Sequence, residues 1–208
     1  MAKIIDEEYW DNLKEPTKLM TFLHKFLTTP QASTMLIAMG VSIVAFFWAY
    51  FLVTIPTEDL IKGFSVYGQF SFEFGWNAQN VDVILANWGS NGRTSVLYAT
   101  IANFVIMASY VIIFFSLIIL ATRQFKEKKK IQDLFLKMLF LPIIAGIFNI
   151  ISNIFMIIML SSGTSVSPII PFITSLSSII KYALIIVSFV IFVIEIVLFV
   201  IIYIKEHR

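Results

Sequence analysis

The sequence predicts an all-α membrane protein: a bundle of four transmembrane helices with an N-terminal amphipathic segment and a 40-residue outer loop at residues 56–95. Three observations lead to this fold class. The 208 residues are 59% hydrophobic and only 13% charged, whereas soluble domains carry about 25% charged residues. Four apolar runs are long enough to cross a hydrocarbon core, which takes about 20 helical residues. Finally, Lys and Arg are concentrated in alternate connections between those runs.

The four predicted spans are helical although they are rich in isoleucine and valine. A bilayer offers no hydrogen bonds to exposed backbone groups, so a segment that crosses it must satisfy those groups within itself. The spans cover residues 33–55, 96–122, 138–160 and 173–204. We therefore treat residues 33–208 as one transmembrane domain, preceded by a separate segment of residues 1–32.

A stripe of small residues marks one face of the first span. Its members recur at spacings of four and three: Ala38, Ser42, Ala45 and Ala49. Small side chains at helical spacing let two helices approach closely, and such packing drives helix association in lipid. We expect this face to pack against the rest of the bundle.

The positions of the basic residues predict the orientation. Twelve of the 15 Lys and Arg residues lie before the first span, between the second and third spans, or after the fourth span. The other three are Lys62 and Arg93 in the outer loop and Lys181 within the fourth span. Because Lys and Arg accumulate in cytoplasmic loops, we expect an integral protein of the plasma membrane with both termini in the cytoplasm.

The N-terminal segment, residues 1–32, mixes apolar and charged side chains and is interrupted at Pro16. This pattern predicts one or two amphipathic helices. Two placements stay open. The helices either lie in the membrane interface with their apolar side in lipid, or lie in the cytoplasm and cover the inner ends of the bundle.

The first part of the outer loop is predicted to be extended. Phe70, Phe72, Phe74 and Trp76 stand at alternate positions, and a period of two is typical of a strand with one apolar face. We expect these rings to lie in the headgroup belt, where amphipathic aromatic residues collect. An aromatic patch that binds a ligand is the alternative.

A short amphipathic helix is predicted next, over residues 77–88. Asn77 or Asn80 can cap its N-terminus by accepting a hydrogen bond from a free backbone N–H. Gly89 can end it, because glycine tolerates the positive φ that commonly terminates a helix.

Arg93 stands at the outer entrance of the second span and is predicted to be an interfacial anchor. A guanidinium group binds planar anions through two parallel hydrogen bonds. Arg93 is therefore expected to bind a lipid phosphate or to pair with a loop carboxylate, Asp82 or Glu73.

From residue 74 onward the chain resembles a group of uncharacterised four-helix integral membrane proteins. Members have a helix, a Gly-x-x-Gly-Arg segment (residues 89–93 here) and then a span that bears an acidic residue. The similarity continues at polar positions of the third and fourth spans: Asn149, Ser152, Asn153, Ser177, Ser178 and Lys181. The chain departs from the group in having Asn103, Asn149 and Ser152 where carboxylates are expected. The resemblance implies a four-helix fold and supplies no activity.

Polar residues of three spans are predicted to share one layer. Asn103, Asn153 and Lys181 each lie seven or eight residues inside the outer end of their span, which is about 10 Å at a rise of 1.5 Å per residue. Asn149 shares a helix face with Gly146 and Asn153. Lys181 has three donors and each asparagine has a carbonyl oxygen, so we expect Lys181 to donate to at least one of them inside the bundle.

Three interpretations of this layer stay open: hydrogen bonds that hold the helices together, a Lys181 that extends to the outer interface, or a ligand or ion site. No carboxylate lies at this depth within the predicted spans. Replacing Lys181 by Met can therefore stabilise the fold, because the change removes a charge from an apolar setting.

Glu195 is a candidate buried acid about ten residues from the inner end of the fourth span. Ser42 and Ser116 are predicted at a similar depth and are expected to hydrogen-bond it. Lys181 precedes Glu195 by 14 residues, or about 21 Å along the helix, so the two cannot pair directly. They can bracket a polar path.

The sequence also argues against several activities. The absence of cysteine excludes disulfide bonds, thiol catalysis and thiolate metal sites. His24 and His207 lie outside the spans, and no glycine-rich phosphate loop precedes a helix. The net charge of +2 is too small to indicate nucleic acid. We expect no enzymatic activity, no catalytic or metal-binding residues and no cofactor.

The preferred interpretation is a non-enzymatic tetraspan that works by contacts, as an accessory subunit or a scaffold. Its expected partners are the lipid bilayer and either another membrane protein or further copies of the same chain. The alternative is an oligomeric transporter or channel that uses the polar layer around Lys181 together with Glu195. Against the alternative stand the small number of spans and the absence of a repeated half.

Overall fold

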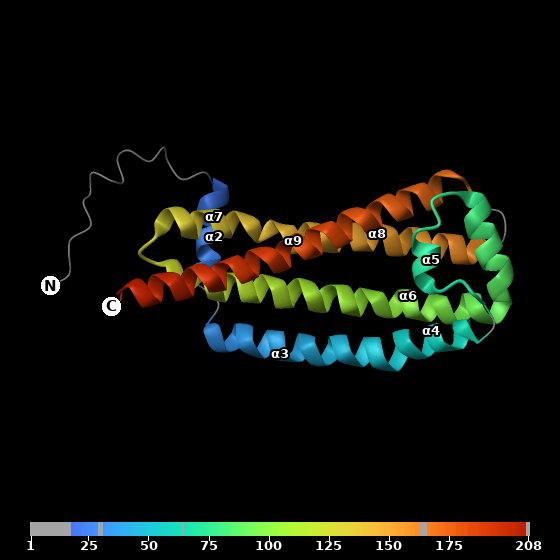
Figure 1. The fold of residues 1–208 in the computed structure, drawn as a ribbon, viewed down its shortest axis with the longest axis horizontal. Helices are drawn as coiled ribbons and strands as arrows, with labels where there is room; N and C mark the ends of the chain where they lie inside the picture. Colours follow the sequence, from blue (N-terminus) through green and yellow to red (C-terminus); the bar gives the residue numbers. More distant parts are fainter. Residues whose placement is uncertain (1–17, 29–30, 64, 163–165, 207–208) are drawn as a thin grey trace.

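The computed structural model describes residues 18–28, 31–63, 65–162 and 166–206, and every regular element in these ranges is a helix (Figure 1). The elements are α2 (Lys18–Thr28), α3 (Ala32–Ala49), the π-helix η1 (Tyr50–Thr54), α4 (Ile55–Lys62), α5 (Gln69–Glu73), α6 (Ala78–Thr122), the 3₁₀ helix η2 (Arg123–Phe125), α7 (Lys129–Met138), α8 (Phe140–Ser162) and α9 (Ile169–Glu206). Four stretches are long and apolar enough to cross a membrane: Ala32–Lys62, Ala78–Phe125, Lys129–Ser162 and Ile169–Lys205. The predicted all-α class with four candidate membrane spans is confirmed.

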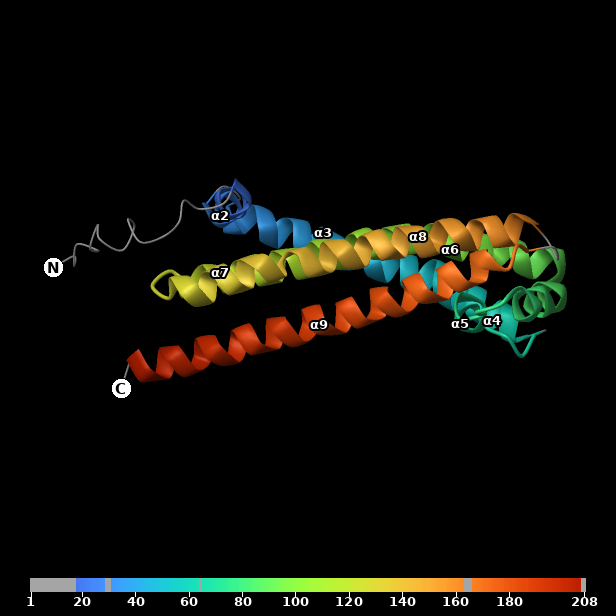
Figure 2. The ribbon, with the colours of Figure 1, turned by 90° about the horizontal axis from the view of Figure 1, so that it is seen from above.

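The two ends of the bundle carry different elements. In Figures 1 and 2, α2, the connection between α6 and α7, and the C-terminal end of α9 lie together at one end. We call this the basic end, because Lys126 and Lys128 lie in that connection and Lys129 and Lys130 begin α7. The opposite end carries α4, α5 and the first turns of α6, and we call it the loop end.

The small-residue face of α3 packs along α6. Ser42 and Ala49 are buried there, whereas Val41 and Val44 on other faces of the same helix are exposed. Exposed apolar side chains are expected on the outer surface of a bundle whose solvent is lipid. The predicted direction of this face toward the bundle is confirmed.

Helix α2 covers the basic end of the bundle. Its Leu23 is buried in a cluster with Ile118 and Ile119 of α6 and with Leu136 and Leu139. His24 of α2 lies 3.2 Å from the carboxylate of Asp133 in α7. This packing favours the placement over the bundle end among the two predicted for the N-terminal segment. Pro16, the predicted interruption, lies outside the described residues.

The extended stretch predicted around Phe70–Trp76 is wrong, because residues 69–73 form helix α5. In a helix the alternate rings divide between two faces. The ring of Phe70 packs at a tilt against that of Phe74, with ring centroids 4.9 Å apart, whereas Phe72 is buried with its ring centroid 5.0 Å from that of Trp88. The carboxylate of Glu58 also accepts a hydrogen bond from the first N–H of α5, that of Gln69, at 3.0 Å. The cap that Glu58 provides for α5, together with the burial of Phe72, thus favours a helix over the strand that the alternating pattern predicts.

The short helix predicted before the second span is present as the first part of α6. The side chain of Asn77 caps it, accepting a hydrogen bond from the backbone N–H of Asn80 at 2.9 Å. Gly89 has a φ of 60° and interrupts the helical backbone, as expected. The helix then resumes at once and continues to Thr122, so the second span and the loop helix form one long element.

A π-helical turn joins α3 to α4. Tyr50–Thr54 contains one turn with wider hydrogen bonding, and Thr54 Oγ1 donates to the carbonyl of Ala49 five residues earlier at 3.4 Å. The first helical stretch therefore continues to Lys62 and does not end at residue 55. Such turns are frequent at functional sites, and this one faces the cavity described below.

Candidate functional site

Glu73, at the end of α5, is the centre of a buried polar network. Its side chain is only 4% exposed, and it lies against α9. Ser178 donates to Glu73 Oε1 at 2.6 Å, Lys181 Nζ donates to the same oxygen, and the hydroxyl of Tyr182 donates to Oε2 at 3.2 Å. Lys181 is 2% exposed. An ion pair removed from water is retained only where further hydrogen bonds satisfy its remaining atoms, and here both carboxylate oxygens have partners.

Both ends of α5 are fixed, so Glu73 is held in place. Glu58 caps the N-terminal end, as described above. At the other end, Ser175 Oγ donates to the backbone carbonyl of Glu73 at 3.2 Å and accepts from the backbone N–H of Trp76 at 3.1 Å. Gly75 lies so close to α6 that a Cβ at this position would come within 2.6 Å of Val81 Cγ2.

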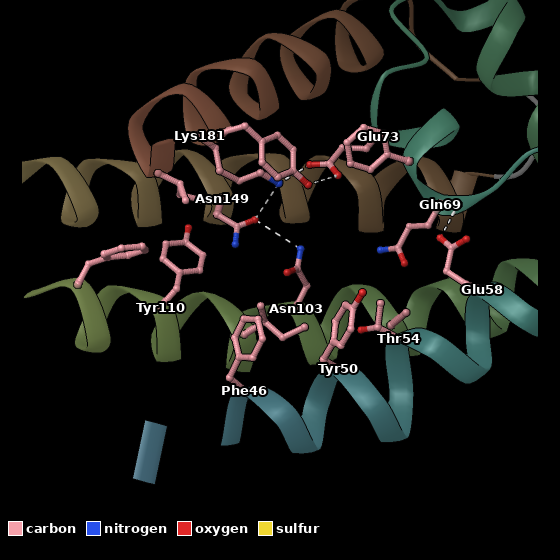
Figure 3. A pocket seen from close by; sticks show the side chains of 16 residues that line it. Phe46, Tyr50, Thr54, Glu58, Gln69, Glu73, Asn103, Tyr110, Asn149 and Lys181 are labelled. Carbon is pink, nitrogen blue, oxygen red and sulfur yellow. Dashed lines mark hydrogen bonds and ion pairs between the residues drawn. The ribbon is translucent and has the colours of Figure 1, made fainter. Parts of the chain in front are cut away.

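The network continues from Lys181 through the amide layer (Figure 3). Lys181 Nζ donates to Asn149 Oδ1 at 3.3 Å. Asn103 Nδ2 donates to Asn149 Oδ1 at 3.5 Å and to Asn153 Oδ1 at 3.0 Å. The structure therefore brings together all four residues of the predicted layer, and Gly146 permits it, because a Cβ there would lie 2.9 Å from Val111 of α6.

The counter-ion of Lys181 was missed by reasoning from the spans alone. Lys181 does not extend to the outer interface, and the expectation that it lacks a carboxylate is wrong, since Glu73 enters from the outer loop. A signal was present in the sequence. Glu73 is the one acid flanked on both sides by phenylalanine, in Phe72-Glu-Phe74. An acid in an aromatic run is expected to be buried, and a carboxylate that stays ionised when buried is normally paired with a cation.

A cavity of about 670 Å³ adjoins the network. Helices α5, α6, α8 and α9 contribute its polar wall: Gln69, Glu73, Asn103, Tyr110, Asn149, Lys181 and Tyr182. Its apolar wall comes from α3, α5, α6 and α9: Phe46, Phe70, Ala99, Ile106, Phe114 and Ile185. Tyr50, Thr54 and Glu58 complete the lining from η1 and α4. Figure 3 shows these side chains pointing into the space between the helices.

Glu195 lies in a second, smaller polar cluster toward the basic end. Its side chain is fully buried, at 0% exposure. Thr122 Oγ1 donates to Glu195 Oε1 at 2.8 Å, and Gln132 Nε2 donates to the carbonyl of Thr122 at 3.4 Å. The expected donors Ser42 and Ser116 are buried but do not hydrogen-bond Glu195. Its Oε2 has no partner among the described residues.

Arg93 does not pair with either expected loop carboxylate. Its Nε donates to the carbonyl of Gly89 in the preceding turn at 3.1 Å. Glu73 is bonded to α9, and Asp82 Oδ1 is buried without a partner within the described ranges. The lipid-phosphate alternative for Arg93 stays a prediction.

Clusters of metal-ligating side chains are the next feature to consider. Within the described part of the chain, no group of three or more His, Cys, Asp or Glu side chains is arranged to hold a metal ion. The network instead combines one ion pair with amides and hydroxyls, which is an arrangement suited to hydrogen bonding.

Comparisons with known proteins assign no family. No protein-family model, no curated protein and no solved structure matches this chain. The resemblance suggested by the Gly-x-x-Gly-Arg segment therefore stays a prediction.

Proposed function

We propose that this protein is a non-enzymatic membrane protein that works by binding, and that the cavity beside Glu73 and Lys181 is its ligand site. The observation that carries the proposal is a cavity of about 670 Å³ with one polar and one apolar wall. Ligand pockets typically have volumes of about 300–1,000 Å³, with mostly apolar walls and a few placed polar groups.

The energetics support binding over a purely structural role. A buried ion pair costs desolvation, and an apolar replacement of similar volume is often equally stable. A bundle that needed only stability would fill this space with apolar side chains. The retained network supports a preorganised surface for a ligand.

An accessory or scaffold role is compatible with this site. In that role the ligand-loaded protein contacts another membrane protein or a second copy of itself through its exposed apolar faces, such as Ile37, Val41 and Val44 of α3. We further propose a plasma-membrane location with the basic end in the cytoplasm. The concentration of Lys and Arg at that end supports the orientation.

Transport by an oligomer is the second candidate, and Glu195 is the observation that favours it. A buried carboxylate oxygen without a partner, in the half of the bundle opposite Lys181, is typical of ion or proton pathways. Flux of ions or protons into liposomes that contain the purified protein would favour this candidate. Loss of that flux in the Glu195→Gln variant would show that the flux depends on the carboxyl group of Glu195.

Native mass spectrometry of the full chain, released from membranes in nanodiscs, tests the proposed site. We expect a bound small molecule in the wild-type protein. Ile185→Trp fills the cavity and should remove it. Ile186→Trp is the matched control, because the neighbouring side chain is 63% exposed and does not line the cavity. A wild-type protein without a ligand, or equal retention in both variants, would contradict the proposal.

A further inference from the structure

The charges that line the cavity restrict the ligand. Three lining side chains carry formal charges: Glu58, Glu73 and Lys181. Glu73 neutralises Lys181, and the carboxylate of Glu58 is engaged at the positive N-terminal end of α5, where it accepts from the backbone N–H of Gln69 at 3.0 Å. An anionic ligand would therefore meet no free cation, whereas a cationic ligand would have to approach the Lys181 ammonium. Charge burial without a partner is costly in both cases, so the cavity favours an uncharged ligand.

The deep polar wall keeps capacity for further hydrogen bonds. Lys181 donates to Glu73 and Asn149, and its ammonium also lies 4.4 Å from the centre of the Tyr182 ring. The hydroxyl of Tyr110 is buried beside the Asn149 side chain, and its O–H donates to no acceptor among the described residues. A buried donor without a partner is stabilised when a ligand supplies an acceptor oxygen. The matching ligand carries neutral acceptors, such as ester or ketone carbonyls or hydroxyl groups.

The apolar wall adjoins the lipid. Phe46 of α3 and Ile185 of α9 line the cavity from its two flanks. Helix α3 packs along α6, and α9 packs on α8 and α6, but α3 and α9 make no comparable contact with each other in the described part of the chain. Toward the loop end, α5 covers the cavity and is bound to Glu58 and to α9. The side between α3 and α9, which few contacts close, is therefore the route that a ligand from the bilayer would take.

We infer that the ligand is an uncharged amphiphile with a neutral, oxygen-rich head, taken from the lipid phase through the gap between α3 and α9. This inference rests on the proposed binding function and adds to it the ligand class and the route. The head hydrogen-bonds to Lys181 and Tyr110. The hydrocarbon part lies along Phe46, Ile106 and Ile185 and continues into the bilayer. No group of the protein changes its covalent state.

Photoreactive lipids with identical acyl chains test the ligand class. The full chain in phosphatidylcholine nanodiscs is exposed in turn to a diacylglycerol probe, a phosphatidate probe and a probe with an ammonium head. We expect the diacylglycerol probe to label cavity peptides of α6 and α9 several-fold more than the other two. Labelling should persist in Ile186→Trp and be lost in Ile185→Trp.

Other outcomes overturn the inference in distinguishable ways. Preferential labelling by the phosphatidate or ammonium probe, lost in Ile185→Trp, would refute an uncharged ligand and leave the binding function standing. Labelling that is the same in Ile185→Trp and Ile186→Trp would place the probes outside the cavity and refute the ligand class. If native mass spectrometry then also finds no ligand, the proposed function fails as well.

Cross-linking the two flanks tests the route. The native chain has no cysteine, so a Phe46→Cys, Ile185→Cys pair can be bridged with a bismaleimide on a clean background. The bridge should slow labelling by the diacylglycerol probe several-fold. The matched controls are the two single-cysteine variants, each blocked with a monofunctional maleimide. Unchanged labelling in the bridged protein would refute sideways access.

Discussion

At the scale of single residues, the bond between Lys181 and Glu73 has the largest energetic consequence in the loop half. Each charge is almost completely removed from water, and each has the other as its only oppositely charged partner among the described residues. Loss of one member leaves the other as a buried charge without a counter-ion. Loss of both members removes that free-energy cost, because neither charge remains. The two single changes and the double change are therefore not additive.

We predict that Lys181→Met destabilises the protein by about 3–5 kcal/mol, the range for breaking one side of a buried pair. This reverses the stabilisation expected from the spans alone, because that expectation lacked Glu73. The double variant Lys181→Met, Glu73→Gln should recover most of the loss. Thermal midpoints in one detergent measure all three variants. A double variant no more stable than Lys181→Met would contradict the pairing.

The two neighbouring asparagines of α8 should respond differently. Asn153 accepts one hydrogen bond, from Asn103, and its own Nδ2 has no partner in the described ranges. Asn153→Leu should therefore be mild, since intramembrane hydrogen bonds average about 0.6 kcal/mol. Asn149 accepts from both Lys181 and Asn103. Asn149→Leu should cost more, about 1.5–3 kcal/mol, because a charged donor loses its acceptor. Equal midpoints for the two variants would contradict the network.

At the scale of elements, α5 shows where sequence patterns stop being informative. Helix α5 has only five residues, and its aromatic i, i+4 pair joins Phe70 to the C-cap residue Phe74. The alternation of rings in the sequence conceals this pair. The cap of α5 comes from Glu58, eleven residues earlier, and Glu73 binds a lysine 108 residues later. Neither of these two contacts can be predicted from the periodicity of the residues in and around α5. By contrast, the cap at Asn77 and the break at Gly89 depend on adjacent residues and were predictable.

The amide layer was predictable for a different reason. Each span supplies an independent depth scale, because helical rise is constant and the outer ends of the spans align at the interface. Asn103, Asn153 and Lys181 could therefore be placed at one level without knowing which faces meet. The partner of Glu195 was not predictable in this way. Thr122 lies at the very end of α6, beyond the depth assigned to Ser42 and Ser116.

The close approach of α5 and α6 gives an element-scale prediction. A Cβ at Gly75 would come within 2.6 Å of Val81 Cγ2, whereas nothing lies within 4 Å of a Cβ at Gly40 in α3. Gly75→Ala should destabilise the protein by about 1–3 kcal/mol, as overpacking does. Gly40→Ala, the matched control, should be neutral or stabilising by up to about 1 kcal/mol through helix propensity. A stable Gly75→Ala protein that keeps its ligand would show that α5 can shift freely.

At the scale of the whole molecule, the two ends of the bundle are chemically unlike. The basic end carries α2, the Lys-rich connection and the end of α9, and the loop end carries the cavity with its cover, α5. If the basic end faces the cytoplasm, the ligand site lies in the outer leaflet. The orientation of the protein therefore decides from which leaflet of the bilayer the proposed site would take its ligand.

Single cysteines test this orientation on the cysteine-free chain. Lys130→Cys, at the basic end, should react with an impermeant maleimide only after the membrane is opened. Asn91→Cys, near the loop end, should react in intact cells. Both side chains are exposed, so accessibility within the protein does not limit either reaction. Reaction of Lys130→Cys in intact cells would reverse the assigned topology.

The long separation between Glu73 and Lys181 also has a consequence for how the molecule is made. Translation delivers the loop that carries Glu73 when only the first helix has left the ribosome, and Lys181 follows 108 residues later. Until the last helix inserts, the carboxylate of Glu73 in this aromatic loop has no Lys181 ammonium to pair with. Closure of the loop over the cavity through this ion pair therefore has to wait until the last helix is in place.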